Sequence, residues 1–113
     1  MILYRPVGEK EKQLIASAGY GAFPPRLPEQ PIFYPVLNEK YAGEIAGRWN
    51  TKDVRSGYKG YVTRFEVEDD YIARYDVQTV GDVYHQEYWI LAEDLEEFNR
   101  HIIGRIEIVK EYG

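Results

Sequence analysis

The sequence predicts an α+β fold in a single domain, residues 1–113, with a mixed, mainly antiparallel sheet and about three helices. The chain is long enough for one core, since 44% of its 113 residues are hydrophobic. Apolar residues alternate with polar ones in the middle of the chain, whereas two other segments have helical spacing. The resulting order, β-α-β-α-β-β-β-α-β, is typical of helices packed against a sheet of this kind.

The first third of the chain predicts a strand, a helix and a stiff loop. Ile2–Arg5 has strand composition and is expected to stop at Pro6, which lacks a backbone donor. Glu9–Ala18 is an amphipathic helix with Gly19 at its end. Five of the six prolines lie between 24 and 35, so Tyr20–Gln30 is expected to be an ordered but irregular loop. Such a loop either shapes a binding site or simply connects two elements.

A second strand and helix follow. Pro31–Val36 is a short strand, and Asn38 is a good N-cap for a helix that reaches about Trp49. Gly43 and Gly47 reduce the helix propensity, so another element is expected to approach the backbone there. The expected buried stripe of this helix consists of Tyr41, Ala42, Ile45, Ala46 and Trp49.

The second half of the chain is expected to be richer in strands. After a mobile loop at 50–59, Tyr61, Thr63, Phe65 and Val67 alternate with more polar residues and indicate a strand with one face on the core. The remaining expected elements are a helical turn at 69–75, strands at 76–80 and 84–91, a helix from Glu93 with Leu95, Phe98 and Ile102 facing inward, and, after Gly104, a closing strand at 105–110.

Composition excludes several classes of function. The net charge of −5 argues against bulk electrostatic binding of nucleic acid. Without cysteine there are no disulfides or thiolate ligands, and the two histidines, His85 and His101, lack metal-ligand spacing, so no metal is expected. The absence of a basic leader or a long apolar run predicts a cytoplasmic protein without a membrane partner.

Charge is unevenly distributed along the chain. The segment 48–64 carries five cations, Arg48, Lys52, Arg55, Lys59 and Arg64, against the single acid Asp53. This basic segment either receives a phosphate-bearing small molecule or is simply solvated.

The stretch 84–91 holds the first candidate site residues. Strand geometry places His85, Glu87, Trp89 and Leu91 on one face. His85 and Glu87 then start about 7 Å apart, close enough to contact one ligand between them. The alternative is that Glu87 is a solvated or ion-paired surface acid and that His85 is an ordinary residue near a turn.

Three short motifs together resemble the layout of ADP-ribosyltransferase-like domains. They are Tyr4-Arg5 in the first strand, Phe33-Tyr34-Pro35 in the second and Glu87-Tyr88-Trp89-Ile90 in a late strand. Nearly the whole chain, especially Phe23–Ala46 and His85–Asn99, also resembles small bacterial proteins filed under an "ADP-ribosylation/crystallin" heading. The crystallin-related ADP-ribosyl hydrolases are large, all-helical, magnesium-dependent enzymes, which this chain does not resemble.

The resemblance implies that NAD binds as a substrate in a cleft between two small sheets. Arg5 would hold a phosphate or ribose, Tyr34 would stack on nicotinamide, and Tyr41 belongs to the same nucleotide-binding group. Glu87 would stabilise the cation that forms as nicotinamide leaves, and His85 would help to choose the acceptor. The chain departs from the family pattern in lacking a Ser-Thr-Ser motif, in placing His85 where Glu or Gln is frequent, and in the spacing of Tyr34 and Tyr41.

Three functions are therefore compared. The first is an ADP-ribosyltransferase or NAD-cleaving enzyme that acts on a nucleotide-type small molecule with a protein or nucleic-acid acceptor. The second is a non-catalytic binding or interaction domain of the same fold. The third is an enzyme acting on a phosphorylated nucleotide or an RNA end through the basic segment.

Overall fold

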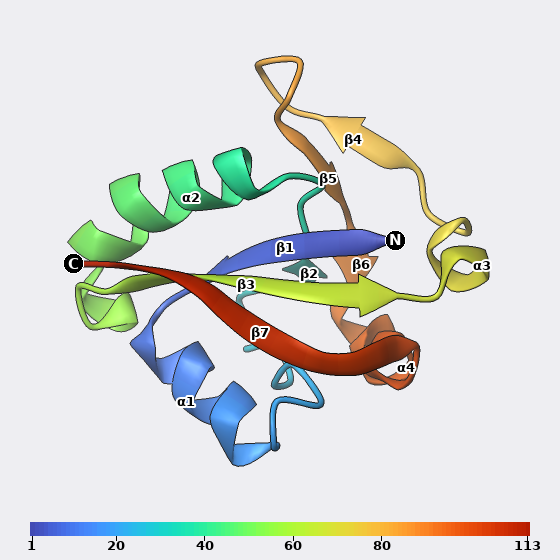
Figure 1. Ribbon diagram of the computed structural model, residues 1–113, viewed down its shortest axis with the longest axis horizontal. Helices are drawn as coiled ribbons and strands as arrows, with labels where there is room; N and C mark the ends of the chain where they lie inside the picture. Colours follow the sequence, from blue (N-terminus) through green and yellow to red (C-terminus); the bar gives the residue numbers. More distant parts are fainter.

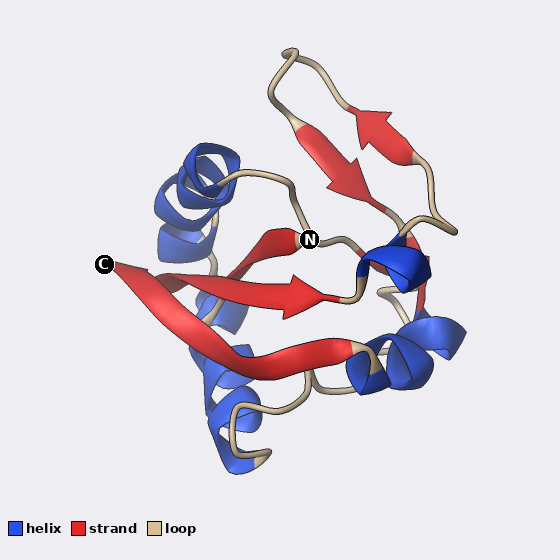
Figure 2. Cartoon of the chain, turned by 45° about the vertical axis from the view of Figure 1, so that its right-hand side comes forward, coloured by secondary structure: helices blue, strands red, loops and turns tan.

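Seven strands and four α-helices form an α+β fold in which every strand pair is antiparallel (Figures 1 and 2). The computed structural model describes residues 1–113. The strands are β1 (Ile2–Val7), β2 (Ile32–Phe33), β3 (Gly60–Val67), β4 (Val77–Thr79), β5 (Gln86–Tyr88), β6 (Ile90–Leu91) and β7 (Ile102–Tyr112). The α-helices are α1 (Glu9–Ser17), α2 (Glu39–Arg48), α3 (Asp69–Ile72) and α4 (Leu95–Arg100). The single turn α3 corresponds to the helical turn expected at 69–75.

The largest sheet has the strand order β1-β3-β7 and lies between α1 and α2 in the view of Figure 1, with the two termini at opposite ends. β1 continues through Pro6 instead of stopping before it, and Pro6 is paired with Val62. The strand can include Pro6 because the nitrogen of this residue, which carries no hydrogen, faces away from β3. The amide of Tyr4 bonds the carbonyl of Val36, on the side away from β3, and Pro6 faces the same way two residues later. Its missing N–H therefore removes no bond to β3.

The predicted strand 84–91 divides into β5 and β6 at Trp89. β6 pairs with β2, whereas β5 pairs with β4 in a hairpin that projects from the rest of the molecule (Figure 2). Val36 joins the sheets, since it bridges Tyr4 of β1 on one side and Glu87 of β5 on the other. This double bridge brings the N-terminal strand and the Glu87 strand together although they are far apart in sequence.

Gly104 is expected to precede the closing strand, but in the structure it lies inside β7. Its φ of +73° is in the left-handed region, where glycine carries no Cβ penalty. The pairing of β3 with β7 shifts between Arg64 and Glu66, whose partners are Glu107 and Ile103 on either side of Gly104. Gly104 therefore forms part of a β-bulge.

Helix α2 begins and packs largely as predicted. The side chain of Asn38 accepts a 2.8 Å hydrogen bond from the amide of Tyr41, which confirms the N-cap. A Cβ added at Gly43 would lie 2.8 Å from the hydroxyl of Tyr112, and one at Gly47 would lie 3.3 Å from its ring, so the close approach is also confirmed. The prediction that Trp49 is buried is wrong. This residue follows the last turn of α2 and is 72% exposed.

The main core is aromatic. Phe23, Phe33, Phe65 and Phe98 contact one another in tilted or edge arrangements. A smaller cluster lies under α2, around Val36, Ala42, Ala46 and Val62. The predicted core face of β3 is confirmed, since Tyr61, Thr63, Phe65 and Val67 are buried.

The segment expected to be a mobile loop contains two 3-10 turns, η1 (Asn50–Lys52) and η2 (Val54–Ser56). The buried hydroxyl of Ser56 donates to Asp53 at 3.1 Å and accepts from Asn50 at 3.0 Å. These bonds give the segment a defined shape. A third 3-10 turn, η3 (Ala92–Asp94), precedes α4.

None of the helices combines the length and the apolar character needed to cross a lipid bilayer.

Candidate functional site

A cleft of about 1610 Å³ runs between α1 and the proline-rich loop on one side and the end of α2 with η1 and η2 on the other. We call it the central cleft. Four sequence-predicted site residues line it, namely Arg5, Tyr34, Tyr41 and Glu87. The double bridge at Val36 places β1, the segment around Tyr34 and β5 side by side, which brings the backbones that carry these residues close together. Their proposed roles remain predictions.

Arg5 is held rigidly at the floor of the central cleft and is only 4% exposed. Its Nε and Nη2 donate to the carboxylate of Glu11 at 2.8 and 3.1 Å. Its guanidinium carbon also lies 4.6 Å from the ring centre of Phe33 and 5.3 Å from that of Tyr34. The remaining terminal nitrogen, Nη1, is buried and has no hydrogen-bond partner.

Arg26, from the proline-rich loop, shares the same carboxylate. Its Nη1 lies 4.0 Å from Oε1 of Glu11, its side chain is 10% exposed, and its Nε is buried without a partner. Burial, and then the neighbouring charge of Arg5, lower the pKa of Arg26. Two guanidinium groups thus depend on one carboxylate, which leaves the floor of the central cleft with excess positive charge.

Glu87 is buried rather than solvated, with 8% of its surface exposed. Its Oε2 accepts a 2.8 Å hydrogen bond from the hydroxyl of Tyr41, and its Oε1 accepts one of 2.7 Å from the indole of Trp89. Burial, and then the bond to Glu87, raise the pKa of Tyr41 above its ordinary value. No cation forms an ion pair with Glu87, so both interpretations of it as a surface acid are wrong.

His85 does not line the central cleft. It precedes β5 in the hairpin turn, where its amide donates to the carbonyl of Asp82 at 3.0 Å. Its ring stacks on Tyr41 at 4.4 Å, and its Nε2 lies 3.3 Å from Glu44. Because the hydroxyl of the same Tyr41 donates to Glu87, His85 and Glu87 both contact one side chain, and a ligand shared between them remains a prediction.

The basic segment divides into two parts. Arg48, Lys52 and Arg55 line the central cleft, whereas Lys59 and Arg64 do not. Arg64 instead crosses the sheet to Glu107, at 3.2 Å.

Sequence reasoning missed Glu11, Arg26 and Trp89. Arg26 is the one cation of the proline-rich loop, a signal that was visible in the sequence. Its pairing with Glu11 of α1 depends on how the proline-rich loop folds back over that helix, which the sequence does not show. Trp89 was placed on the Glu87 face, but its hydrogen bond to that residue was not foreseen.

No family model, curated protein or solved structure matches the chain.

Proposed function

We propose that the central cleft binds NAD and that the protein cleaves the bond between nicotinamide and ribose, as an ADP-ribosyltransferase or an NAD-cleaving enzyme. One observation carries the proposal. The buried side-chain nitrogen and oxygen atoms that lack a partner are Arg5 Nη1, Arg26 Nε and Asn50 Oδ1, and all three residues line this cleft. Buried polar groups are normally paired, because an unpaired one costs about 1–3 kcal/mol. Two donors and one acceptor without partners, all on residues that line one cleft, favour a polar ligand there.

The charge at the floor of the cleft favours a phosphate ester. Glu11 compensates only one of the two guanidinium groups, so an anion would satisfy both the free donors and the excess charge. The planar fork of arginine matches phosphate oxygens well. Tyr34, beside Arg5, offers an aromatic surface next to this position, which suits a nucleotide better than inorganic phosphate.

Glu87 would act on the ribose. When the bond from the anomeric carbon to nicotinamide breaks, its electron pair leaves with nicotinamide and the ribose becomes positively charged. A carboxylate aimed at this carbon stabilises that charge. A water or acceptor oxygen then attacks the anomeric carbon and releases its proton to solvent. Tyr41 and Trp89 occupy one acceptor position on each oxygen of Glu87, which leaves others for the ribose.

Two variants test the proposal. With NAD as ligand, calorimetry measures the dissociation constant and chromatography measures nicotinamide release. Glu87→Gln should reduce kcat about a hundredfold or more, with little change in NAD affinity. Glu66→Gln, an exposed acid on β3 outside the cleft, is the matched control. An unchanged rate of release in Glu87→Gln would remove Glu87 from the mechanism.

Arg5→Lys keeps the charge but removes the fork of donors. It should weaken NAD binding about tenfold, whereas Arg105→Lys, on the exposed surface of β7, should not. NAD binding that is insensitive to Arg5→Lys would refute the placement of the phosphate.

A non-catalytic binding domain is the second candidate. It is favoured by the two hydrogen bonds to Glu87, since a carboxylate held by Tyr41 and Trp89 also serves to stabilise the fold. In that case NAD or a related nucleotide binds and Arg5→Lys weakens it, but no nicotinamide is released. The same two measurements therefore separate the two functions.

A further inference from the structure

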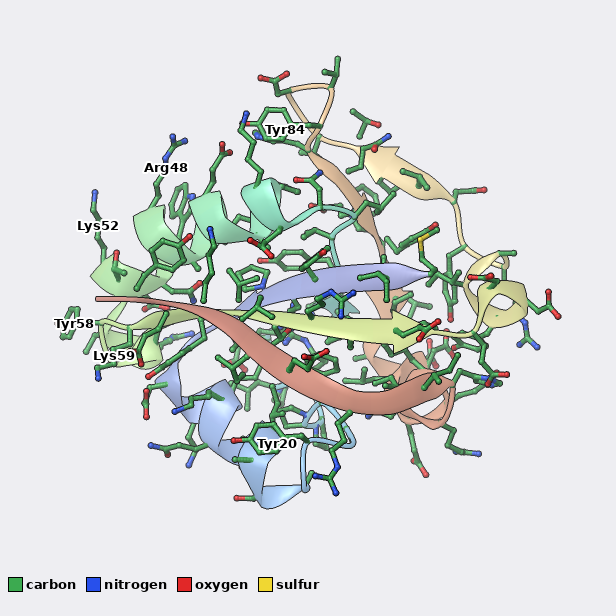
Figure 3. All side chains as sticks on the ribbon, in the orientation of Figure 1. Tyr20, Arg48, Lys52, Tyr58, Lys59 and Tyr84 are labelled. Carbon is green, nitrogen blue, oxygen red and sulfur yellow. The ribbon has the colours of Figure 1, made fainter.

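The mouth of the central cleft carries four exposed cations that the proposed NAD site does not use. They are Lys10, Arg48, Lys52 and Arg55, and we call them the cationic rim. Figure 3 shows Arg48 and Lys52 extending away from the body of the protein at the end of α2. The rim is therefore a positively charged surface on a chain whose net charge is −5.

The cationic rim is poorly neutralised. Lys10, Arg48 and Lys52 form no ion pair, and Arg55 approaches Glu29 only at 4.0 Å with both side chains largely exposed. Such an exposed pair contributes little. The nearby carboxylate of Asp53 is already engaged, since it accepts from the amide of Arg55 at 3.0 Å and from Ser56 at 3.1 Å.

One dinucleotide does not account for this charge. In the proposed NAD site its two phosphates would contact the two guanidinium groups at the floor, Arg5 and Arg26. The cleft is also larger than the range of about 300–1,000 Å³ typical of small-ligand sites. Its volume and its cations leave room for a second, polyanionic ligand.

Trp49 indicates which polyanion fits. Its indole is 72% exposed at the mouth of the cleft, next in sequence to the rim residue Arg48. An exposed indole among cations is a stacking surface for an unpaired base. Phosphate groups alone, or an acidic peptide, would use the cations but not Trp49.

We propose that the cationic rim binds single-stranded nucleic acid, with one base stacked on Trp49 and the neighbouring phosphates on Lys52 and Arg55. A duplex would not fit this role, because its bases are stacked on one another. The net charge predicts no bulk binding of nucleic acid, and the proposal agrees with that prediction, since the contact is confined to one short surface. Binding at the rim requires neither NAD nor its cleavage.

The test measures fluorescence anisotropy of a labelled strand of about ten nucleotides, without NAD. RNA and DNA strands of one sequence are compared with their duplexes over about 50 to 200 mM salt. The single strands should bind, and each of Lys52→Gln and Arg55→Gln should reduce the slope of log affinity against log salt by about 0.7. Trp49→Ala should weaken binding about tenfold. Binding of either strand supports the site, and the comparison shows whether the 2′-hydroxyl contributes.

Arg100→Gln and Arg105→Gln are matched controls, because both remove an exposed cation outside the cleft. Circular dichroism verifies that each variant is folded. Equal loss of affinity in these controls, equally tight binding of duplex, or displacement by polyglutamate as effective as by unlabelled strand would each overturn the proposal. So would the absence of binding at low salt. Because NAD is omitted, none of these results bears on NAD cleavage.

Discussion

The indole nitrogen of Trp89 donates a 2.7 Å hydrogen bond to Oε1 of Glu87, two residues earlier on the same strand face. A side chain that is itself 48% exposed therefore orients a carboxylate that is 8% exposed. Trp89, between β5 and β6, and Tyr41, on α2, together fix the direction of the Glu87 carboxylate. A carboxylate held in this way is oriented before any substrate arrives.

Trp89→Phe should preserve most of the packing but remove the donor to Glu87. We expect a loss of about 1 kcal/mol in the free energy of unfolding, measured by urea denaturation, and a lower kcat if Glu87 acts on the ribose. Trp49→Phe is the control, since its side chain is largely exposed and forms no hydrogen bond. Its unfolding free energy should remain within about 0.5 kcal/mol of the parent protein. Equal stability of Trp89→Phe would show that the bond does not hold Glu87 in place.

The tyrosines predict a loss of stability at alkaline pH. Burial, and then the hydrogen bond to Glu87, raise the pKa of Tyr41 above 10.0, and burial, and then the bond to Tyr75, do the same for Tyr71. A folded-state pKa above the unfolded value means that the folded state holds the proton more tightly. This contribution is complete below about pH 10 and is lost as the pH rises toward the folded-state values.

Absorbance at the tyrosinate band, followed against pH, measures this effect. Part of the tyrosine signal should titrate only as the protein unfolds above about pH 10. Tyr41→Phe should remove one delayed group and make stability less dependent on pH in that range. A single titration near the ordinary value, with the fold intact, would contradict the assignment.

Local signals predicted much of the fold. The N-cap at Asn38 and the alternation in β3 depend on residues a few positions apart, and both are confirmed. The errors have tertiary causes. Pro6 is tolerated in β1 because its nitrogen faces away from β3, and Gly104 bulges because β7 changes register against β3. Neither relationship is visible in a window of sequence.

In the candidate site, too, some features were predicted from the sequence and others depend on tertiary structure. Arg5, Tyr34, Tyr41 and Glu87, which were selected by resemblance, line one cleft. His85 contacts Tyr41, as Glu87 does, but it lies in the turn before β5 and does not line the cleft. The sharing of Glu11 by two arginines required knowledge of how the proline-rich loop returns to α1, which periodicity does not contain.

Gly60 allows α2 to pack closely on β3, because it has no Cβ. A Cβ at this position would lie 2.8 Å from the carbonyl carbon and 3.0 Å from the Cα of Ala46, so backbone would have to move. Gly60→Ala should therefore lower the free energy of unfolding by about 1–3 kcal/mol. Gly21→Ala is the control, since its new Cβ would approach only the carbonyl oxygen of Ala18, at 3.4 Å. Denaturation curves that coincide for the two variants would contradict the close contact.

Asn99 anchors the proline-rich loop, which carries Arg26, to α4. Its Oδ1 accepts from the amide of Phe23 at 2.9 Å, and its Nδ2 donates to the carbonyl of the same residue at 3.0 Å. Asn99→Ala removes both bonds and leaves partly buried backbone groups unpaired, which should cost about 2 kcal/mol in unfolding free energy.

Asn99→Asp separates the two bonds, because it keeps the acceptor and loses the donor. If the anchor positions Arg26 for a phosphate, NAD affinity measured by calorimetry should fall in both variants, and further in Asn99→Ala. The affinity should also become less sensitive to Arg26→Lys once the anchor is lost, since the two changes act on the same contact. Independent, additive losses would instead indicate that Asn99 stabilises the fold without positioning the loop.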